Sequence, residues 1–455
     1  MPELVKNNSY TMTVSDLGSE GEGIARKDGF VVLVPGALPG ETVRAKIIKL
    51  TRSYAVGKLE EILDASPYRV EPPCAHFKAC GGCTLQHMDY NEQLKYKTKH
   101  VRDCLERIGG ITGFVMHDCI GMDKPFRYRN KTQFPAKEVD GAFSLGLYSP
   151  RSHRLVVMDD CLISDEKASQ ITRIVKDIFG SHKGIAYDEE LHTGIIRHVV
   201  VRSNSLGELM IIFVINADTL PREKELISRL KRIPGVKSIV VNINKKPGNT
   251  ILGDKYRVIW GDDYITDTVC GLKAAVSPAS FMQVNRVQAE KLYNIALEAA
   301  ALTGAETVID AYCGTGLLTQ LLARKARFAY GIEYVPEAIE DACKSARDNS
   351  TDNIEFIVGD CARVLPEISR KARPDVIVLD PPRKGCDTEV LAASGESGAG
   401  RIVYISCNAA TLARDCKVLA GYGYAVKEVW AVDMFPHTGH VESIVLMTNS
   451  GLKGK

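Results

Sequence analysis

The sequence predicts a multidomain α/β protein with a small N-terminal β-barrel, a central α/β domain and a C-terminal Rossmann-like domain. Three observations lead to this prediction. The first 66 residues hold short β-prone runs separated by glycine and proline. Residues 140–265 alternate between strand-like and helix-like patterns, and the chain from residue 267 onward repeats a regular strand–helix rhythm. A length of 455 residues is enough for about three domains.

Five β-prone runs fall within residues 1–66, at 11–14, 23–25, 30–34, 43–48 and 55–59. So many strands in so short a stretch predict a small barrel. The fourth and fifth runs and the turn between them carry side chains that suit a surface facing RNA, namely Arg44, Lys46, Lys49, Arg52, Tyr54 and Lys58. On charge alone, a solvated edge whose cations prevent aggregation is an equally good interpretation.

The composition limits the classes of function. The formal net charge of +2 is small, so any nucleic-acid binding must rest on local basic patches. The N-terminus lacks an apolar signal core, and no apolar run is long enough to span a membrane, so we expect a cytoplasmic protein without a membrane partner. Thiols stay reduced in that compartment. The thirteen cysteines are therefore expected to be free, metal-binding or catalytic.

Three of these cysteines stand close together in the sequence, after a proline-rich linker. Cys74, Cys80 and Cys83, with two glycines before the last, are able to converge on one centre. Cys161 is the best candidate for a fourth thiol. Zinc sites usually show two short cysteine pairs, and only one is present here, so the spacing favours an iron–sulfur cluster. Zinc binding and unligated thiols stay open as alternatives.

Two further stretches combine the residue types that contact RNA. Phe126, Arg127, Arg129 and Lys131 interleave aromatic and cationic side chains, which suits stacking on bases and contact with phosphates. An amphipathic strand with extended basic side chains is the alternative. Arg197 and His198, on a predicted strand over 194–202, are also candidates for RNA contact. For His198 a structural role is the more common case.

The C-terminal region predicts a doubly wound sheet. Its strands are expected at 307–312, 328–333, 354–358, 375–380, 401–406, 424–432 and 441–447. The first five alternate with helices, and the short connection between the last two fits an antiparallel pair at a sheet edge. Such a sheet binds its ligand beyond the carboxyl ends of its strands.

Acidic residues lie at or just beyond the ends of three successive predicted strands, and Asp310 is the one near the end of the first. After the first strand, Tyr312 precedes a short loop with Gly314 and Gly316, which allows a ligand to approach a helix N-terminus. Glu333 ends the second strand and is able to accept both ribose hydroxyls, and Asp360 follows the third, within reach of an adenine amino group. This series predicts an adenosine ligand. The loop lacks a pyrophosphate-binding pattern, which favours S-adenosylmethionine over NAD.

The next strand ends and the following connection carry the reactive groups. Asp380 ends the fourth strand, before two prolines and the cation Arg383, which suits an RNA phosphate. Cys407 follows the fifth strand, where an exposed thiol is well placed as a nucleophile. The stretch 433–442 returns a carboxylate, Glu442, toward the same edge. Gln283 is a polar residue ahead of the helix that opens this domain.

These motifs, in this order, resemble the RNA uracil-5-methyltransferases, the 5-methyluridine family, over nearly the whole chain. The stretches 21–25 and 34–41 resemble the TRAM module, an OB-like RNA-binding barrel. Asp-Pro-Pro-Arg-Lys-Gly at 380–385 and Ser-Cys-Asn at 406–408 are specific to the family. The four-cysteine set is similar to that of members that carry a [4Fe-4S] cluster and act on 23S ribosomal RNA, which we therefore expect as the substrate. Transfer RNA is the alternative.

The resemblance implies roles for individual residues. Cys407 matches the nucleophile and Glu442 the base, while Gln283, Tyr312, Glu333 and Asp380 match residues that line the methyl-donor and uracil site. It also implies three domains: TRAM at 1–66, a central iron–sulfur domain at 67–90 and 124–266, and a class I methyltransferase domain at 91–123 and 267–455. Two other classes stay open, an amino-group methyltransferase and a non-catalytic RNA-binding assembly factor. No protein partner is inferred.

Overall fold

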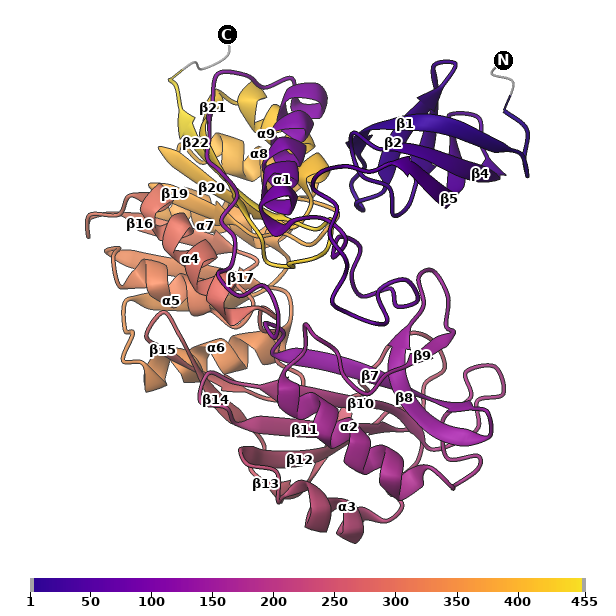
Figure 1. Ribbon diagram of the computed structural model, residues 1–455. Coiled ribbons are helices and arrows are strands. Elements are labelled where there is room, and N and C mark those ends of the chain that lie inside the picture. The colour runs from indigo at the N-terminus through magenta and orange to yellow at the C-terminus, as the bar shows by residue number, and fades with distance from the viewer. Residues whose placement is uncertain (1–3, 452–455) are drawn as a thin grey trace.

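The computed structural model describes residues 4–451, which form three bodies (Figure 1). The first is a closed five-stranded barrel in the order β1-β2-β3-β5-β4. Alternating apolar residues such as Val14, Val32 and Val43 fill its interior. The predicted barrel is confirmed, with strands β1 (Ser9–Leu17), β2 (Gly23–Lys27), β3 (Phe30–Val34), β4 (Thr42–Leu50) and β5 (Tyr54–Asp64).

The second body is a seven-stranded sheet in the order β13-β12-β11-β10-β7-β8-β9. Its strands are β7 (Lys131–Val139), β8 (Ala142–Tyr148), β9 (Leu155–Val157), β10 (Ile196–Ser203), β11 (Leu209–Ile215), β12 (Val236–Ile243) and β13 (Lys255–Gly261). Helices α2 (Glu166–Phe179) and α3 (Glu223–Leu230) pack on one face. The hairpin of β14 (Ile265–Val269) and β15 (Leu272–Val276) packs on the other face. The expected domain boundary at 266/267 cuts β14, so we propose to place it before Ile265.

The third body is an eight-stranded sheet in the order β18-β17-β16-β19-β20-β22-β21-β6. The strands lie close to their predicted positions, at β16 (Thr307–Ala311), β17 (Phe328–Glu333), β18 (Ile354–Val358), β19 (Val376–Leu379), β20 (Arg401–Ser406), β21 (Tyr424–Val432) and β22 (Glu442–Asn449). Helices connect or flank them, namely α4 (Arg286–Ala300), α5 (Leu317–Ala323), α6 (Pro336–Asp348), α7 (Cys361–Ala372), α8 (Thr388–Glu396) and α9 (Ala409–Gly421).

One expectation for this sheet is wrong in detail. The last two strands are antiparallel to each other, as predicted, but they do not form the sheet edge. β22 inserts between β20 and β21, antiparallel to both, and the short strand β6 (Val115–Met116) pairs with the outer side of β21. The middle of β22, from Ile444 to Met447, is an uninterrupted apolar run, which fits a strand covered on both faces.

Helix α1 (Tyr90–Cys104), with the π-helical turn Leu105–Gly109 that continues it, packs on α9 and β21 of the third body. Asp89 begins α1 by accepting the Asn91 N–H at 2.9 Å. α1 also touches the barrel, because the Tyr96 hydroxyl donates to Gly18 O at 2.6 Å. Within residues 4–451, no helix is long and apolar enough to cross a bilayer.

The barrel lies directly against the connection between β21 and β22. A Cβ placed on Gly439 would stand 2.8 Å from Ser19 O and 2.9 Å from Gly21 N, so only glycine permits this approach. An apolar cluster joins the barrel to α1 and to the segment before it, through Leu17, Leu38, Leu85, Met88 and Tyr96. The barrel is therefore packed onto the third body rather than joined to it by a linker alone.

Candidate active site

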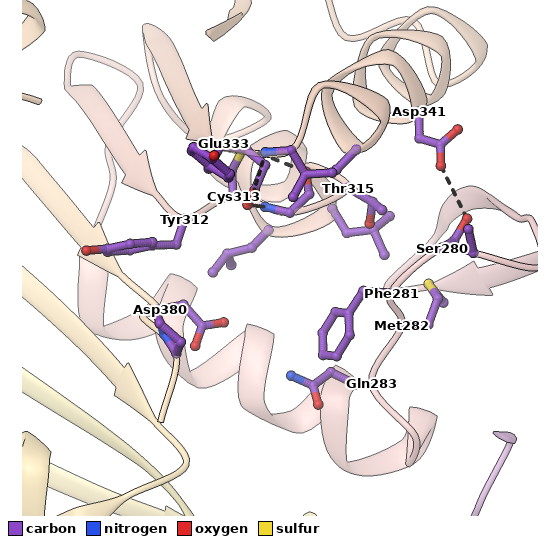
Figure 2. Close-up of a pocket in the computed structure, with 18 of the residues that line it drawn as sticks. Ser280, Phe281, Met282, Gln283, Tyr312, Cys313, Thr315, Glu333, Asp341 and Asp380 are labelled. Carbon is purple, nitrogen blue, oxygen red and sulfur yellow. Dashed lines mark hydrogen bonds between the residues drawn. The ribbon is translucent and has the colours of Figure 1, made fainter. Parts of the chain in front are cut away.

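A cavity of about 1320 Å³ opens beyond the carboxyl ends of β16, β17, β19 and β20. It collects most of the residues predicted for the cofactor and the chemistry, namely Gln283, Tyr312, Gly314, Glu333, Asp360, Asp380, Arg383, Cys407 and Glu442. Figure 2 shows Phe281 and Gln283 on one side of this space, facing Tyr312 and Asp380 on the other. Residues that are distant in sequence thus meet because parallel strands end at one edge of the sheet.

Glu333 is held by the loop after β16. Its carboxylate accepts the Gly314 N–H at 3.1 Å and the Val335 N–H at 3.0 Å. Gly314 has a positive φ of 53° and lines the cavity. Gly316 (φ 72°) does not line the cavity; a Cβ there would stand 2.5 Å from the Phe356 ring. Gly314 therefore leaves room for a ligand, whereas Gly316 allows the loop to pack.

Asp360 and Asp310 complete this side of the cavity. Asp360 begins α7, and its side chain accepts the Ala362 N–H at 3.0 Å. Asp310, on β16, accepts the Thr319 hydroxyl at 2.6 Å, and burial raises its pKa to about 7. The acidic series after three strands is thus present at one edge, as the sequence predicted.

Cys407 directly follows β20, and Glu442 begins the neighbouring strand β22. Ser406 on β20 pairs with Ser443 on β22, so the same register brings Cys407 opposite Glu442. Both residues line the cavity, with Glu442 buried and Cys407 half-buried. A ligand bound in the cavity would therefore meet the Cys407 and Glu442 side chains together.

The charges around this pair shift its protonation equilibria. Burial raises the pKa of Cys407, and the Glu442 carboxylate raises it further, while Arg383 opposes both. Burial also raises the pKa of Glu442 to about 8, with a contribution from Asp380, whose own pKa burial raises to about 7. Arg383 counteracts the shift at Glu442. The free site therefore favours the neutral thiol and carboxylic acid at neutral pH.

The backbone that carries Arg383 is tied to the Cys407 turn. Asn408 caps α9 and donates from its side chain to Arg383 O at 3.3 Å, and the Thr411 hydroxyl donates to the same oxygen at 3.4 Å. Arg414 donates to Lys384 O at 3.0 Å. The backbone at Arg383 and the turn at Cys407 are thus held together by helix α9.

Sequence reasoning missed several aromatic rings at this cavity, among them Phe281, Phe435 and His440. Phe281, which is 71% exposed, stands two residues before Gln283. Phe435 and His440 reach the cavity from the connection between β21 and β22. An exposed phenylalanine next to a predicted ligand residue was the available signal for Phe281; nothing in the sequence distinguished Phe435 and His440.

The predicted RNA-contacting residues separate into two groups. Arg383 is exposed at the cavity, and Lys131 is half-buried with a pKa lowered to about 8 by burial and by Arg202 and Arg129. Phe126 stacks on the His437 ring at a centroid distance of 4.2 Å. Among the predicted residues, Arg383, Lys131 and Arg129 are at least partly exposed and have no carboxylate within ion-pair distance. Phe126 is also partly exposed.

The other group is used inside the protein. Arg127 forms two hydrogen bonds with Asp160, at 2.8 and 2.6 Å, and also donates to Cys161 O. Arg197 is buried and donates to three backbone carbonyl oxygens, while burial lowers the pKa of the buried His198 to about 4. Burial removes Arg197 and His198 from contact with RNA, so neither belongs to the surface proposed below.

The four predicted metal-ligating cysteines gather around one small cavity. Cys74, Cys80, Cys83 and Cys161 line it together with the apolar side chains of Phe77, Leu147, Met158 and Ile163. The Gly82 N–H donates to Cys80 Sγ at 3.3 Å. Burial raises the pKa of Cys83 to about 12. Within residues 4–451, no group of three or more His, Cys, Asp or Glu is arranged to hold a metal ion, so the cluster stays a prediction.

The doubly wound sheet, with one strand antiparallel to both neighbours and a cavity at the strand ends, defines a class I methyltransferase. The model of the tRNA (uracil-5-)-methyltransferase family matches residues 252–450, and that of the TRAM domain matches residues 6–59. Two proteins named as uncharacterized RNA methyltransferases are similar over nearly their whole lengths. That of Halalkalibacterium halodurans is 48% identical over 97% of each chain. That of Clostridium tetani is 46% identical over 99% of this chain and 98% of its own.

The chain belongs to the RNA uracil-5-methyltransferase family and carries a TRAM domain. It is thus an RNA-modifying enzyme that uses S-adenosylmethionine. A similar solved structure is the Pyrococcus abyssi tRNA (uracil-54, C5)-methyltransferase in complex with S-adenosyl-L-homocysteine. It matches 96% of this chain and 100% of its own with a TM-score of 0.76 and 25% identity. The family membership excludes the amino-group methyltransferase and the non-catalytic factor that the sequence left open.

Proposed function

We propose that the enzyme methylates C5 of one or more uridines in 23S ribosomal RNA through a covalent adduct between Cys407 and C6 of the base. The observation that carries this proposal is that Cys407, directly after β20, and Glu442, at the start of the neighbouring strand β22, line one cavity. C5 of uracil is a weak nucleophile, and addition of a thiolate to C6 creates an enolate whose C5 is reactive. S-adenosylmethionine supplies the methyl group as a sulfonium, so no catalytic metal is required.

The residues of the cavity divide the remaining tasks. The uridine leaves its stack to reach Cys407. Glu442 removes the C5 proton, the electrons of the C5–H bond form the C5–C6 double bond, and the C6–S bond breaks to release the Cys407 thiolate. Asp380 and Gln283 hold the reactants. On the adenosine side, Glu333 faces the ribose hydroxyls and Asp360 the adenine amino group, with Gly314 leaving room for the ligand and Tyr312 lining its place.

Ribosomal RNA is proposed because the four cysteines are gathered at one cavity, in the pattern of the ribosomal RNA branch. Arg383, Lys131 and Arg129, with Phe126, would contact the RNA next to the active site, and the TRAM barrel would extend that surface. Transfer RNA is the second candidate, favoured by the similarity to the Pyrococcus abyssi tRNA enzyme over 96% of this chain.

Covalent trapping tests the chemistry and the RNA class together. RNA transcribed with 5-fluorouridine carries fluorine at C5, which a base cannot remove as a proton, so the adduct should persist on a denaturing gel when S-adenosylmethionine is present. We expect an adduct with 23S ribosomal RNA. It should be absent in Cys407→Ala and unchanged in Cys343→Ala, which removes a half-buried thiol that does not line the cavity. An adduct with transfer RNA alone would change the substrate, and no adduct with either RNA would overturn the mechanism.

We further propose that Cys74, Cys80, Cys83 and Cys161 hold a [4Fe-4S] cluster. Four soft thiol donors around one cavity, an apolar wall and an amide donating to Cys80 Sγ fit such a group. A bound cluster would supply a structural tie between the segment 74–83 and the central domain at Cys161. Arg127, through Asp160 and Cys161 O, would hold the fourth ligand in place.

Metal analysis of anaerobically purified protein tests this proposal. The wild type should contain iron and acid-labile sulfide in equal amounts. Its solution should also show the visible absorption typical of iron–sulfur proteins. Cys161→Ser should lose both, whereas Cys343→Ala should retain them. If the wild type contains zinc and no sulfide, the site binds zinc instead of a cluster. If it contains neither iron nor zinc, the four thiols are unligated.

A further inference from the structure

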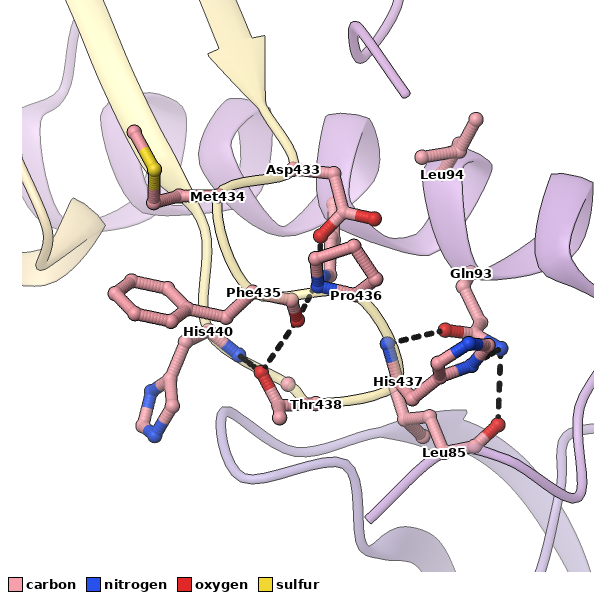
Figure 3. Close-up of polar contacts among 12 residues, drawn as sticks. Leu85, Gln93, Leu94, Asp433, Met434, Phe435, Pro436, His437, Thr438 and His440 are labelled. Carbon is pink, nitrogen blue, oxygen red and sulfur yellow. Dashed lines mark hydrogen bonds and ion pairs between the residues drawn. The ribbon is translucent and has the colours of Figure 1, made fainter. Parts of the chain in front are cut away.

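The connection between β21 and β22, residues 433–441, leads directly into Glu442 and also supplies Phe435 and His440 to the cavity. Glu442 is the first residue of β22 and pairs with Val432 at the end of β21. The position of the Glu442 carboxylate therefore depends on how this connection is held. Figure 3 shows that polar side chains from α1 reach it.

A fully buried ion pair holds the start of the connection. The side chains of Lys97 and Asp433 are both 0% exposed, and the Lys97 ammonium donates to the Asp433 carboxylate. The Tyr90 hydroxyl donates to the second Asp433 oxygen at 2.7 Å. Lys97 also donates to Phe435 O at 3.2 Å, which in addition accepts the Thr438 hydroxyl at 2.8 Å. The pair is thus hydrogen-bonded to both sides of the turn.

Gln93 holds the middle of the connection. Its side-chain oxygen accepts the His437 N–H at 3.1 Å, and its amide nitrogen donates to Leu85 O at 3.0 Å and Met88 O at 2.8 Å. The Thr84 and Leu85 N–H groups both donate to His437 O at 2.9 Å. Tyr90, Gln93 and Lys97 are spaced three and four residues apart, so they lie on one face of α1.

Stability alone does not account for these residues. Replacing a buried ion pair by apolar residues of similar size is often neutral or stabilising, because the desolvation of two charges offsets their attraction. Directional hydrogen bonds, in contrast, fix one arrangement of the turn. We infer that Tyr90, Gln93 and Lys97 are positioning residues that hold Glu442 for removal of the C5 proton. This inference rests on the proposed role of Glu442.

Proton removal is the last chemical step, so a displaced Glu442 should slow release of the adduct and leave the earlier methyl transfer largely intact. Tyr90, Lys97 and Asp433, which are joined by the ion pair and the Tyr90 hydrogen bond, are called the clamp below. The double variant Lys97→Met/Asp433→Asn removes its ion pair without leaving an unpaired buried charge. Tyr90→Phe removes a single hydroxyl from the same clamp and is the milder change. Lys95→Met is the matched control, because Lys95 lies on α1 but is 70% exposed and contacts Glu92 and the Tyr68 ring rather than the connection.

The experiment follows one turnover with radiolabelled S-adenosylmethionine on transcribed 23S ribosomal RNA and, separately, on a pool of transfer RNA transcripts. We expect both clamp variants to incorporate methyl within about 3-fold of the wild-type rate and to prolong the adduct about 10- to 100-fold, with a smaller effect for Tyr90→Phe. Lys95→Met should match the wild type. If the double variant fails to show a cooperative melting transition, the adduct lifetime of Tyr90→Phe tests the inference on its own.

If the clamp variants lose methyl incorporation but keep the wild-type adduct lifetime, the inference is overturned. That result would indicate a structural defect, which lowers the amount of active enzyme and does not slow adduct release in particular. Glu442→Gln separates the two levels of the argument. If Glu442→Gln prolongs the adduct and the clamp variants do not, only the positioning role fails. If Glu442→Gln leaves the adduct lifetime unchanged, the proposed role of Glu442 fails as well.

Discussion

Glu442→Gln is expected to reduce turnover about 1000-fold while a methylated covalent adduct with RNA accumulates. A positioned general base contributes about 100- to 10,000-fold, and glutamine keeps the size and burial of the side chain but does not accept the proton. Addition of Cys407 to C6 precedes proton removal and should continue. The measurement compares released 5-methyluridine under steady-state conditions with RNA-bound protein on a denaturing gel, and mass spectrometry of the adduct shows whether the methyl group is present.

Glu428→Gln is the control, because Glu428 lies on β21 of the same sheet but does not line the cavity, and its half-buried side chain pairs with His117. It should turn over at the wild-type rate. A Glu442→Gln enzyme that loses turnover and forms no adduct would contradict the assignment, since the carboxylate would then be required before or during addition of the thiol.

Turnover of the wild type is expected to rise about 50-fold between pH 6 and pH 8 when proton removal limits the rate. Glu442 acts as the carboxylate, and burial raises its pKa to about 8, so the active form is scarce at pH 6 and about half-populated at pH 8. Cys407 acts as the thiolate, and its pKa is also raised, so formation of the adduct should increase with pH in the same direction.

Rapid-quench measurement at each pH separates the two groups, because adduct formation follows Cys407 and adduct release follows Glu442. In Glu442→Gln the pH dependence of release should disappear and that of formation should persist. A rate that is flat or falls from pH 6 to pH 8 in the wild type would contradict the protonation states proposed for both residues.

The sequence predicted the sheet of the third body and most of its cavity because local signals agree there. Val376–Leu379 and Ile402–Ile405 are uninterrupted apolar runs, as expected for strands buried on both faces. Polar residues follow directly after such strands, and parallel strands end at one edge. Glu333, Asp380 and Cys407 could therefore be placed together without knowledge of any long-range contact.

What the sequence did not predict depends on contacts between distant segments. Lys97 on a basic helix looks like a solvated side chain, and only the packing of α1 against Asp433 buries it. Arg197 looks like a cation available to RNA, yet neighbouring backbone carbonyls surround it. The position of β22 inside the sheet also depends on pairing, which the length of a connection does not reveal.

The contact between Gly439 and the barrel turn at Ser19–Gly21 limits how this enzyme can be recombined with its relatives. A foreign RNA-binding module fused in place of the barrel would need a turn that approaches Gly439 equally closely without a steric clash. Otherwise it would displace the segment that leads into Glu442. The barrel and the 433–441 connection therefore have to fit each other, although 368 residues lie between Asp64, the last residue of the barrel, and Asp433. Chimeras designed at the linker after the barrel should exchange both segments together.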